Sequence, residues 1–167
     1  AELADLSDLE WHFIGPIQSN KTRAIAEHFH WVHSVDRLKV ARRLSEQRPD
    51  HLPPLNTCLQ VNVDDEESKS GCRLDDLPAL AAGVSALPRL NLRGLMAIPD
   101  PDQSEDSLRA SFRALAAALD NLKQQGDVSG SLDTLSMGMS GDLELAIAEG
   151  ATLVRVGTAL FGARDYR

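Results

Sequence analysis

Short runs rich in β-branched and aromatic residues alternate with helical patterns along the whole chain. Six such runs favour strands, at residues 11–14, 31–35, 57–63, 92–98, 134–137 and 153–156. Helical patterns cover residues 20–29, 36–47, 74–87, 105–125 and 142–149, and a last short helix is expected at 158–161. Strict alternation predicts an α/β fold with parallel strands, which is either an open doubly wound sheet or a closed (β/α)₈ barrel of the TIM type.

The length of the chain bears on the choice between these two folds. A complete barrel takes about 250 residues, or about 30 per βα unit, whereas this chain has 167. If the fold is a barrel, six βα units are present and the first two are absent. Residues 1–167 would then form one partial barrel domain. An open sheet requires no missing unit, but it accounts less well than a barrel for the two glycine-containing loops described below.

Composition excludes several classes of function. The net charge of −8 argues against a nucleic-acid-binding protein. Residues 21–48 are locally basic, which we interpret as solvated helix faces, with a docking patch for an acidic partner as the alternative. No stretch approaches the roughly 18 apolar residues that span a membrane. Cys58 and Cys72 do not suggest a disulfide framework, so a soluble cytoplasmic protein is expected.

Two loops near the end of the chain combine glycine with a hydroxyl residue where a helix begins. They are MGMSGD (137–142) and RVGTALFG (155–162). Helix N-termini offer free N–H groups to anions, and barrel enzymes often bind phosphate in the loops after their last two strands. Ser140, Gly157 and Thr158 are therefore predicted to form a phosphate site. The alternative is that Ser140 and Thr158 are plain N-caps and the glycines plain turn formers.

Charged residues flank these loops. Arg155 precedes Gly157 by two residues on a strand, so its side chain is predicted to point from the barrel rim toward the same ligand. The alternative is a buried ion pair of Arg155 with Asp142 or Glu144. Those two carboxylates must point away from a bound anion, because they would otherwise compete with it.

Several long motifs resemble a known family. The residues are HFIGPIQSNKTR (12–23), SVDR (34–37), VNVDDEESKSGC (61–72), RGLMAIP (93–99), LSMGMSGDLELAIAEG (135–150) and VRVGTALFGARDY (154–166). They resemble the YggS/PROSC family of pyridoxal-phosphate homeostasis proteins over essentially the entire chain. The resemblance implies a single (β/α)₈ barrel like the N-terminal domain of alanine racemase, with pyridoxal 5′-phosphate (PLP) held at the carboxyl ends of the strands.

The resemblance also implies roles for particular residues. Ser140, Gly157 and Thr158 would hold the phosphate, Met139 would line the site, and Arg155 would lie near the pyridine nitrogen. An arginine there disfavours a protonated pyridinium and weakens the electron sink of PLP chemistry, which fits a carrier or a racemase-type site better than an aminotransferase. The resemblance implies a homeostasis protein without established turnover, so no catalytic residue is assigned.

The family's Schiff-base lysine lies in a Val-Ser-Lys motif on its first strand, and that motif is absent from this chain. None of the chain's lysines is therefore assigned this role. Lys21 and Lys69 lie in shared motifs, but we interpret both as surface charges.

Other functions remain open on the sequence. A PLP-dependent racemase-type enzyme would need a catalytic tyrosine from a second domain, and Tyr166 is the only tyrosine here. A phosphosugar-binding barrel enzyme would need a general base, for which His12 and Asp64 are the candidates. A metal site at His28, His30 and His33 is disfavoured, because no cysteine or carboxylate cluster accompanies them. An incomplete barrel exposes strand edges, so self-association or pairing with the missing N-terminal segment is expected.

Overall fold

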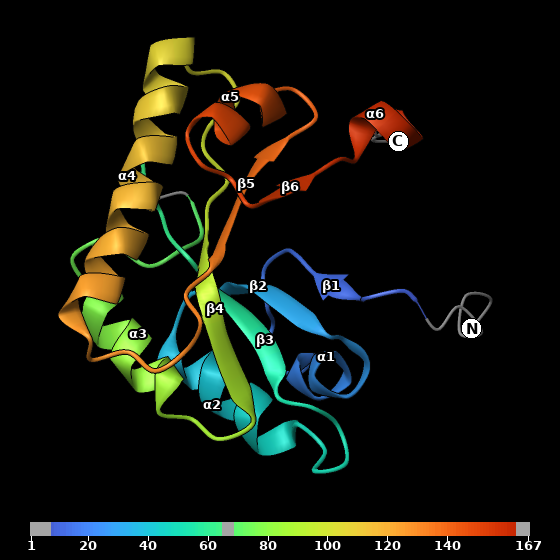
Figure 1. Ribbon diagram of the computed structural model, residues 1–167. Helices are drawn as coiled ribbons and strands as arrows, with labels where there is room; N and C mark the ends of the chain where they lie inside the picture. The colour runs from blue at the N-terminus through green and yellow to red at the C-terminus, as the bar shows by residue number, and fades with distance from the viewer. Residues whose placement is uncertain (1–7, 65–68, 163–167) are drawn as a thin grey trace.

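The fold is a single sheet of six parallel strands, each followed by a helix (Figure 1). The computed structural model describes residues 8–64 and 69–162. The strands are β1 (His12–Phe13), β2 (Trp31–Val35), β3 (Leu55–Gln60), β4 (Leu90–Met96), β5 (Thr134–Met139) and β6 (Leu153–Arg155). The helices are α1 (Thr22–His28), α2 (Leu38–Gln47), α3 (Leu77–Ser85), α4 (Glu105–Gln125), α5 (Leu143–Ala148) and α6 (Thr158–Phe161).

The strand order distinguishes between the two predicted topologies. The strands lie in the order β1-β2-β3-β4-β5-β6, so every neighbour in the sheet is also a neighbour in the sequence. A doubly wound sheet reverses its strand order at a switch point, and this sheet has none. The alternative of an open doubly wound sheet is therefore wrong. The chain forms a half-barrel, with α2, α3 and α4 along one side of the sheet in Figure 1.

The two faces of the sheet carry different side chains, because successive residues of a strand point to opposite faces. Val32, Leu59 and Leu95 belong to the main core. Trp31, Cys58 and Met96 form a separate small apolar cluster, and the buried polar side chains of His33 and Ser136 lie on the same face as these three. We call this second face the inner face, since it is the one that a barrel would enclose.

The longest helix shows how closely local signals set an element's ends. At the start of α4, the Ser104 hydroxyl accepts a hydrogen bond from the Ser107 amide at 3.3 Å, and Glu105 and Asp106 lie in the first turn. Its C-cap is Gly126 in the left-handed conformation, with φ 72°. The bounds predicted for this helix, 105–125, are confirmed.

Arg48 is the residue for which the sequence analysis was most misleading. It belongs to the basic segment that we interpreted as solvated, yet it is only 3% exposed. Its Nη1 donates to the carbonyl oxygens of Ala26 and Phe29 at 2.7 and 2.8 Å, and its Nε donates to that of Pro53 at 2.8 Å. Arg48 therefore satisfies carbonyls at the carboxyl end of α1 and does not belong to a solvated helix face.

Candidate functional site

The five residues predicted to form the site lie together at the carboxyl ends of β5 and β6. Met139 and Arg155 are paired in the register of these two strands. Ser140 follows β5 directly, and Gly157 and Thr158 lie where β6 passes into α6. Figure 1 shows the turn after β5, and α6 beyond β6, at the upper side of the view. The fold thus brings both glycine- and hydroxyl-containing loops to one edge of the sheet.

The Ser140 hydroxyl joins the two loops. Its Oγ accepts hydrogen bonds from the backbone amides of Gly157 at 3.2 Å and Ala159 at 3.3 Å. Ser140 therefore caps α6, whereas its own helix α5 has Asp142 at the N-cap position. Thr158 is the first residue of α6 and follows the N-cap Gly157, so the alternative that Thr158 is a plain N-cap is wrong. Two amides that converge on one oxygen have the geometry of an anion site.

We call Ser140, Gly157 and Thr158 the cup, and the carboxylates near it are directed elsewhere. One carboxylate oxygen of Asp142 accepts the Met139 amide, which keeps this nearly buried side chain on the backbone of its own loop. Glu144 is exposed on α5. Neither carboxylate forms an ion pair with Arg155 among the described residues, so the alternative of a buried ion pair is wrong.

Arg155 is instead held by uncharged acceptors. Its Nη1 donates to both the carbonyl oxygen and the hydroxyl of Ser136, at 2.8 Å each, and its Nη2 donates to the carbonyl of Ala97 at 3.0 Å. Burial lowers the pKa of Arg155, although a guanidinium stays charged at any physiological pH. The site therefore holds a largely buried positive charge that forms no ion pair with a described carboxylate, although the charge of Asp142 favours its protonated form.

The hydrogen bonds of Arg155 continue across the inner face. His33 Nδ1 lies 2.8 Å from the Ser136 hydroxyl, and His33 Nε2 lies 2.8 Å from His12 Nδ1. Burial, with smaller contributions from His12 and Arg155, lowers the pKa of His33 to about 3. We call His12, His33, Ser136 and Arg155 the inner-face row. It links β1, β2, β5 and β6, which include both edge strands of the sheet.

The inner-face row was not predicted from the sequence. His33 was considered only with His28 and His30 as a metal site, and the structure groups no three metal-ligating side chains anywhere in its described residues. His12 was considered only as a general base, and Ser136 was not singled out. The available signal was the alternation in WVHSV, which places Trp31 and His33 on the same face of β2.

Gly138 in MGMSGD is required by packing. Its φ is +93°, and a Cβ placed there would lie 2.6 Å from the Cβ of Ala146 on α5. Close packing of helix on strand thus requires this glycine, and the approach of a ligand does not explain it. Gly157 differs, because a Cβ there would meet no atom within 4 Å.

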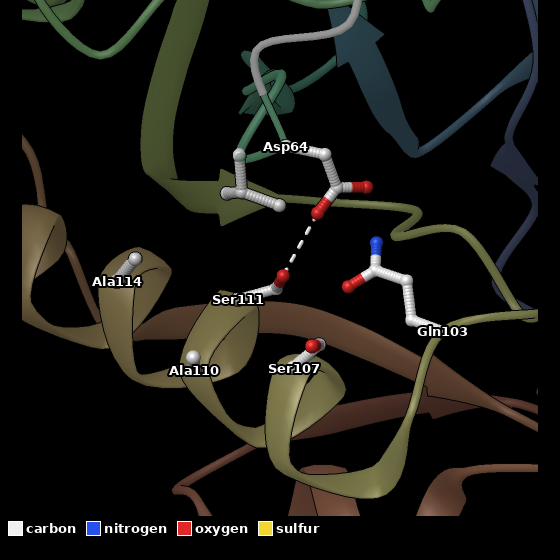
Figure 2. Close-up of a pocket in the computed structure, with 7 residues that line it drawn as sticks. Asp64, Gln103, Ser107, Ala110, Ser111 and Ala114 are labelled. Atoms are coloured by element: carbon white, nitrogen blue, oxygen red, sulfur yellow. Dashed lines mark hydrogen bonds between the residues drawn. The ribbon is translucent and has the colours of Figure 1, made fainter.

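A second concave region lies between α4 and the loop after β3. It is a cavity of about 580 Å³ lined by Asp64, Gln103, Ser111 and neighbouring small residues (Figure 2). The Asp64 carboxylate accepts from Lys69 Nζ at 2.7 Å, the Ser111 hydroxyl at 2.8 Å and the Asp100 amide at 3.1 Å. Burial alone would raise the pKa of Asp64, but the hydrogen bonds from Lys69, Gln103, Ser111 and Asp100 hold it below its usual value.

These contacts bear on two residues considered from sequence. A carboxylate with several donors and a lowered pKa is a poor general base, so the structure gives Asp64 no support in the phosphosugar alternative. Lys69 is an ion-pair partner of this buried carboxylate, where we expected only a surface charge. Lys21 is exposed at the N-cap of α1, without a side-chain cap hydrogen bond.

Six parallel strands in sequential order, each followed by a helix, define a class of α/β domains in which the sheet forms a half-barrel. Residues 2–165 match the family model of the alanine racemase N-terminal domain. The chain belongs to this family and, within it, to the group of proteins named pyridoxal phosphate homeostasis protein.

Relatives and solved structures support this assignment. The pyridoxal phosphate homeostasis protein of Pseudomonas aeruginosa is 68% identical over 166 residues, which are 99% of this chain and 69% of that protein. PipY of Synechococcus elongatus with PLP bound has a TM-score of 0.86 at 40% identity, over 96% of this chain and 74% of PipY. An alanine racemase of Clostridium difficile, 14% identical, shares the fold with a TM-score of 0.74 over 96% of this chain and 41% of the racemase. No helix among the described residues is long and apolar enough to cross a membrane.

Proposed function

We propose that this chain binds pyridoxal 5′-phosphate at the carboxyl ends of β5 and β6 and takes part in PLP homeostasis without catalytic turnover. The observation that carries the proposal is the convergence of the Gly157 and Ala159 amides on the Ser140 hydroxyl. When PLP binds, a phosphate oxygen would take the place of this oxygen as acceptor of the two amides, and the displaced Ser140 hydroxyl would donate to the phosphate. A relative that is 40% identical has been solved with PLP bound, and the more similar Pseudomonas aeruginosa relative is named for PLP homeostasis.

The chain's own residues fit the parts of PLP. Ser140, Gly157 and Thr158 would hold the phosphate, Met139 would line the site, and Arg155 would face the pyridine nitrogen. When bound, PLP supplies an electron sink that is strongest with a protonated ring nitrogen. Arg155 has only donors to offer and therefore favours the unprotonated ring. This preference fits a carrier better than an enzyme that stabilises carbanions.

We propose that the chain holds PLP without a covalent bond to a lysine. Its four lysines are Lys21, Lys39, Lys69 and Lys123. All four lie on helices, at their ends or in a loop, and none lies on a strand of the sheet. Lys69 pairs with Asp64. None therefore occupies the place on a first strand where the family carries its Schiff-base lysine.

Titration of PLP into the 167-residue chain, followed by absorbance, tests this function. Saturable binding that inorganic phosphate competes away is expected, and borohydride reduction with peptide mapping should label no single lysine stoichiometrically. Arg155→Leu should weaken binding at least tenfold, or about 1.4 kcal/mol, because a charged hydrogen bond to the ring is lost. Arg42→Leu, which removes an exposed arginine of α2, is the matched control.

Three results of that experiment would each contradict a separate part of the proposal. A native chain that fails to bind PLP would rule out the function. Stoichiometric labelling of one lysine would rule out noncovalent binding. Equal losses in Arg155→Leu and Arg42→Leu would remove Arg155 from the site.

We further propose that the half-barrel is part of an eight-unit (β/α)₈ barrel. β1 and β6 each have one edge without a neighbouring strand in the described sheet. Apolar side chains are exposed near both edges: Trp11 and Ile14 beside β1, and Val156, Leu160 and Phe161 beyond β6. The Nε1 of Trp31, buried on the inner face, has no hydrogen-bond partner among the described residues. Two further units between β6 and β1 would cover these groups.

This second proposal predicts self-association of the 167-residue chain. Sedimentation velocity should show dimers or larger species at micromolar concentration, because unpaired strand edges and apolar surface promote pairing between chains. The variant Phe161→Ser, at a side chain that is 88% exposed, should shift the distribution toward monomer. A native chain that sediments as a single monomeric species would contradict the proposal.

A further inference from the structure

The inner-face row has one arrangement of hydrogen atoms in which the hydrogen of the Ser136 hydroxyl also has an acceptor. A guanidinium can only donate, so the Ser136 hydroxyl accepts from Arg155 and can give its own hydrogen to another group. The neighbouring acceptor is His33 Nδ1. His33 then carries its hydrogen on Nε2, from which it donates to His12 Nδ1. In this arrangement His33 is protonated on Nε2, and His12 Nδ1 is the acceptor.

The row matters because Arg155 forms no ion pair within residues 8–64 and 69–162 that would hold it. Fixing a long arginine side chain costs up to about 2 kcal/mol of rotamer entropy. Two of its three acceptors, the carbonyls of Ser136 and Ala97, belong to the backbone and are rigid. The third is the Ser136 hydroxyl, which can rotate. Without His33 Nδ1 to accept its hydrogen, the Ser136 side chain is free to adopt another rotamer, which takes its oxygen away from the guanidinium.

We infer that His33 is a positioning residue, which holds the Ser136 hydroxyl as an acceptor for Arg155 and so fixes the guanidinium that faces the ring of the ligand. This inference rests on the proposed binding of PLP and extends it to residues away from the carboxyl-end loops. His33 touches neither Arg155 nor the phosphate cup through a direct hydrogen bond. It acts through Ser136, which lies 103 residues further along the chain.

The inference distinguishes ring recognition from phosphate recognition. The cup of Ser140, Gly157 and Thr158 involves no member of the row. A change at His33 should therefore weaken the binding of PLP and leave the binding of inorganic phosphate unaltered. A general loss of folding would instead weaken both to the same extent.

The experiment compares His33→Ala with His33→Asn in the 167-residue chain. An asparagine Oδ1 lies close to the place of the histidine Nδ1 and can accept from Ser136, whereas alanine cannot. His33→Ala should bind PLP about tenfold more weakly than the native chain, and His33→Asn should stay within about threefold. Both should bind inorganic phosphate with native affinity. His51→Ala, at an exposed histidine, is the control.

A second measurement does not depend on PLP. In ¹⁵N spectra of arginine side chains, separate Nη signals are seen only when rotation of the guanidinium is blocked. Arg155 should give such signals in the native chain and in His33→Asn, and lose them in His33→Ala. Unchanged Arg155 signals in His33→Ala, or equal PLP affinities in the two variants, would overturn the inference. A native chain that binds no PLP would overturn the proposed function, while the arginine spectrum still decides whether His33 positions Arg155.

Discussion

Replacing Arg48 with methionine is expected to lower the free energy of unfolding by about 3 kcal/mol. The side chain donates to the carbonyls of Ala26, Phe29 and Pro53. Methionine fills similar space but leaves these acceptors unpaired, and each buried acceptor without a donor costs about 1–3 kcal/mol. Since domains are stable by only about 5–15 kcal/mol, the variant should be visibly closer to unfolding in a urea titration.

Arg23→Met provides the matched control for this prediction. Arg23 lies on α1, its side chain is 70% exposed, and its ion pair with Glu27 spans 3.8 Å. Exposed pairs of this kind contribute little, so the loss should stay below about 0.5 kcal/mol. Arg48→Lys should fall between the two, because one ammonium cannot reach all three carbonyls. Equal urea midpoints for Arg48→Met and Arg23→Met would contradict the role assigned to Arg48.

Acidification from pH 7 to pH 5 is expected to lower the free energy of unfolding by about 2 kcal/mol through His33 alone. The pKa of His33 is about 3 in the native protein, against 6.5 for an ordinary histidine side chain. Below pH 6.5 the His33 side chain therefore binds a proton in the unfolded chain but not in the native chain. Stability is fully present above that pH and falls as the pH drops toward 3. His12 from β1 and Arg155 from β6 face this imidazole, and both oppose its charging.

The measurement is a series of urea titrations at pH 7, 6 and 5. The window lies above the range in which carboxylates with lowered pKa values, such as Asp64 and Asp133, take up protons. His33→Asn should remove most of the decrease, and exposed His51→Asn should retain it. His12, whose pKa burial also lowers, should account for a smaller remaining decrease. A decrease of the same size in His33→Asn and the native chain would contradict this assignment.

The elements themselves were largely predictable, because their signals are local. Ser104 caps the start of α4 and Gly126 ends it, so both signals lie directly beside the helix that they delimit. Pairing of strands was not predictable in the same way. Alternation of strand and helix is identical in a doubly wound sheet and in a barrel, and only the neighbour chosen by each strand distinguishes them. That choice is made by packing of side chains from distant parts of the chain.

The candidate site also has features that a local sequence pattern predicts and features that depend on contacts between distant residues. Ser140 and Gly157 could be predicted because glycine and a hydroxyl at the start of a helix are a local pattern. The capping of α6 by Ser140 could not, since the two lie in different loops, 17 residues apart. Arg48 looks like any charged residue at the end of an amphipathic helix, and its burial depends on the carbonyls of α1.

The span of the inner-face row also has a kinetic consequence. All neighbouring strands of this sheet are consecutive in sequence, so each pairing closes a short loop and can form quickly. The bond between His33 and Ser136 must wait for β5, and the anchoring of Arg155 must wait for β6. The strands β2, β3 and β4 can thus associate early in refolding, whereas the guanidinium is immobilised only at the final step. A spectroscopic signal from Arg155 would therefore report the association of β6 with β5 during folding.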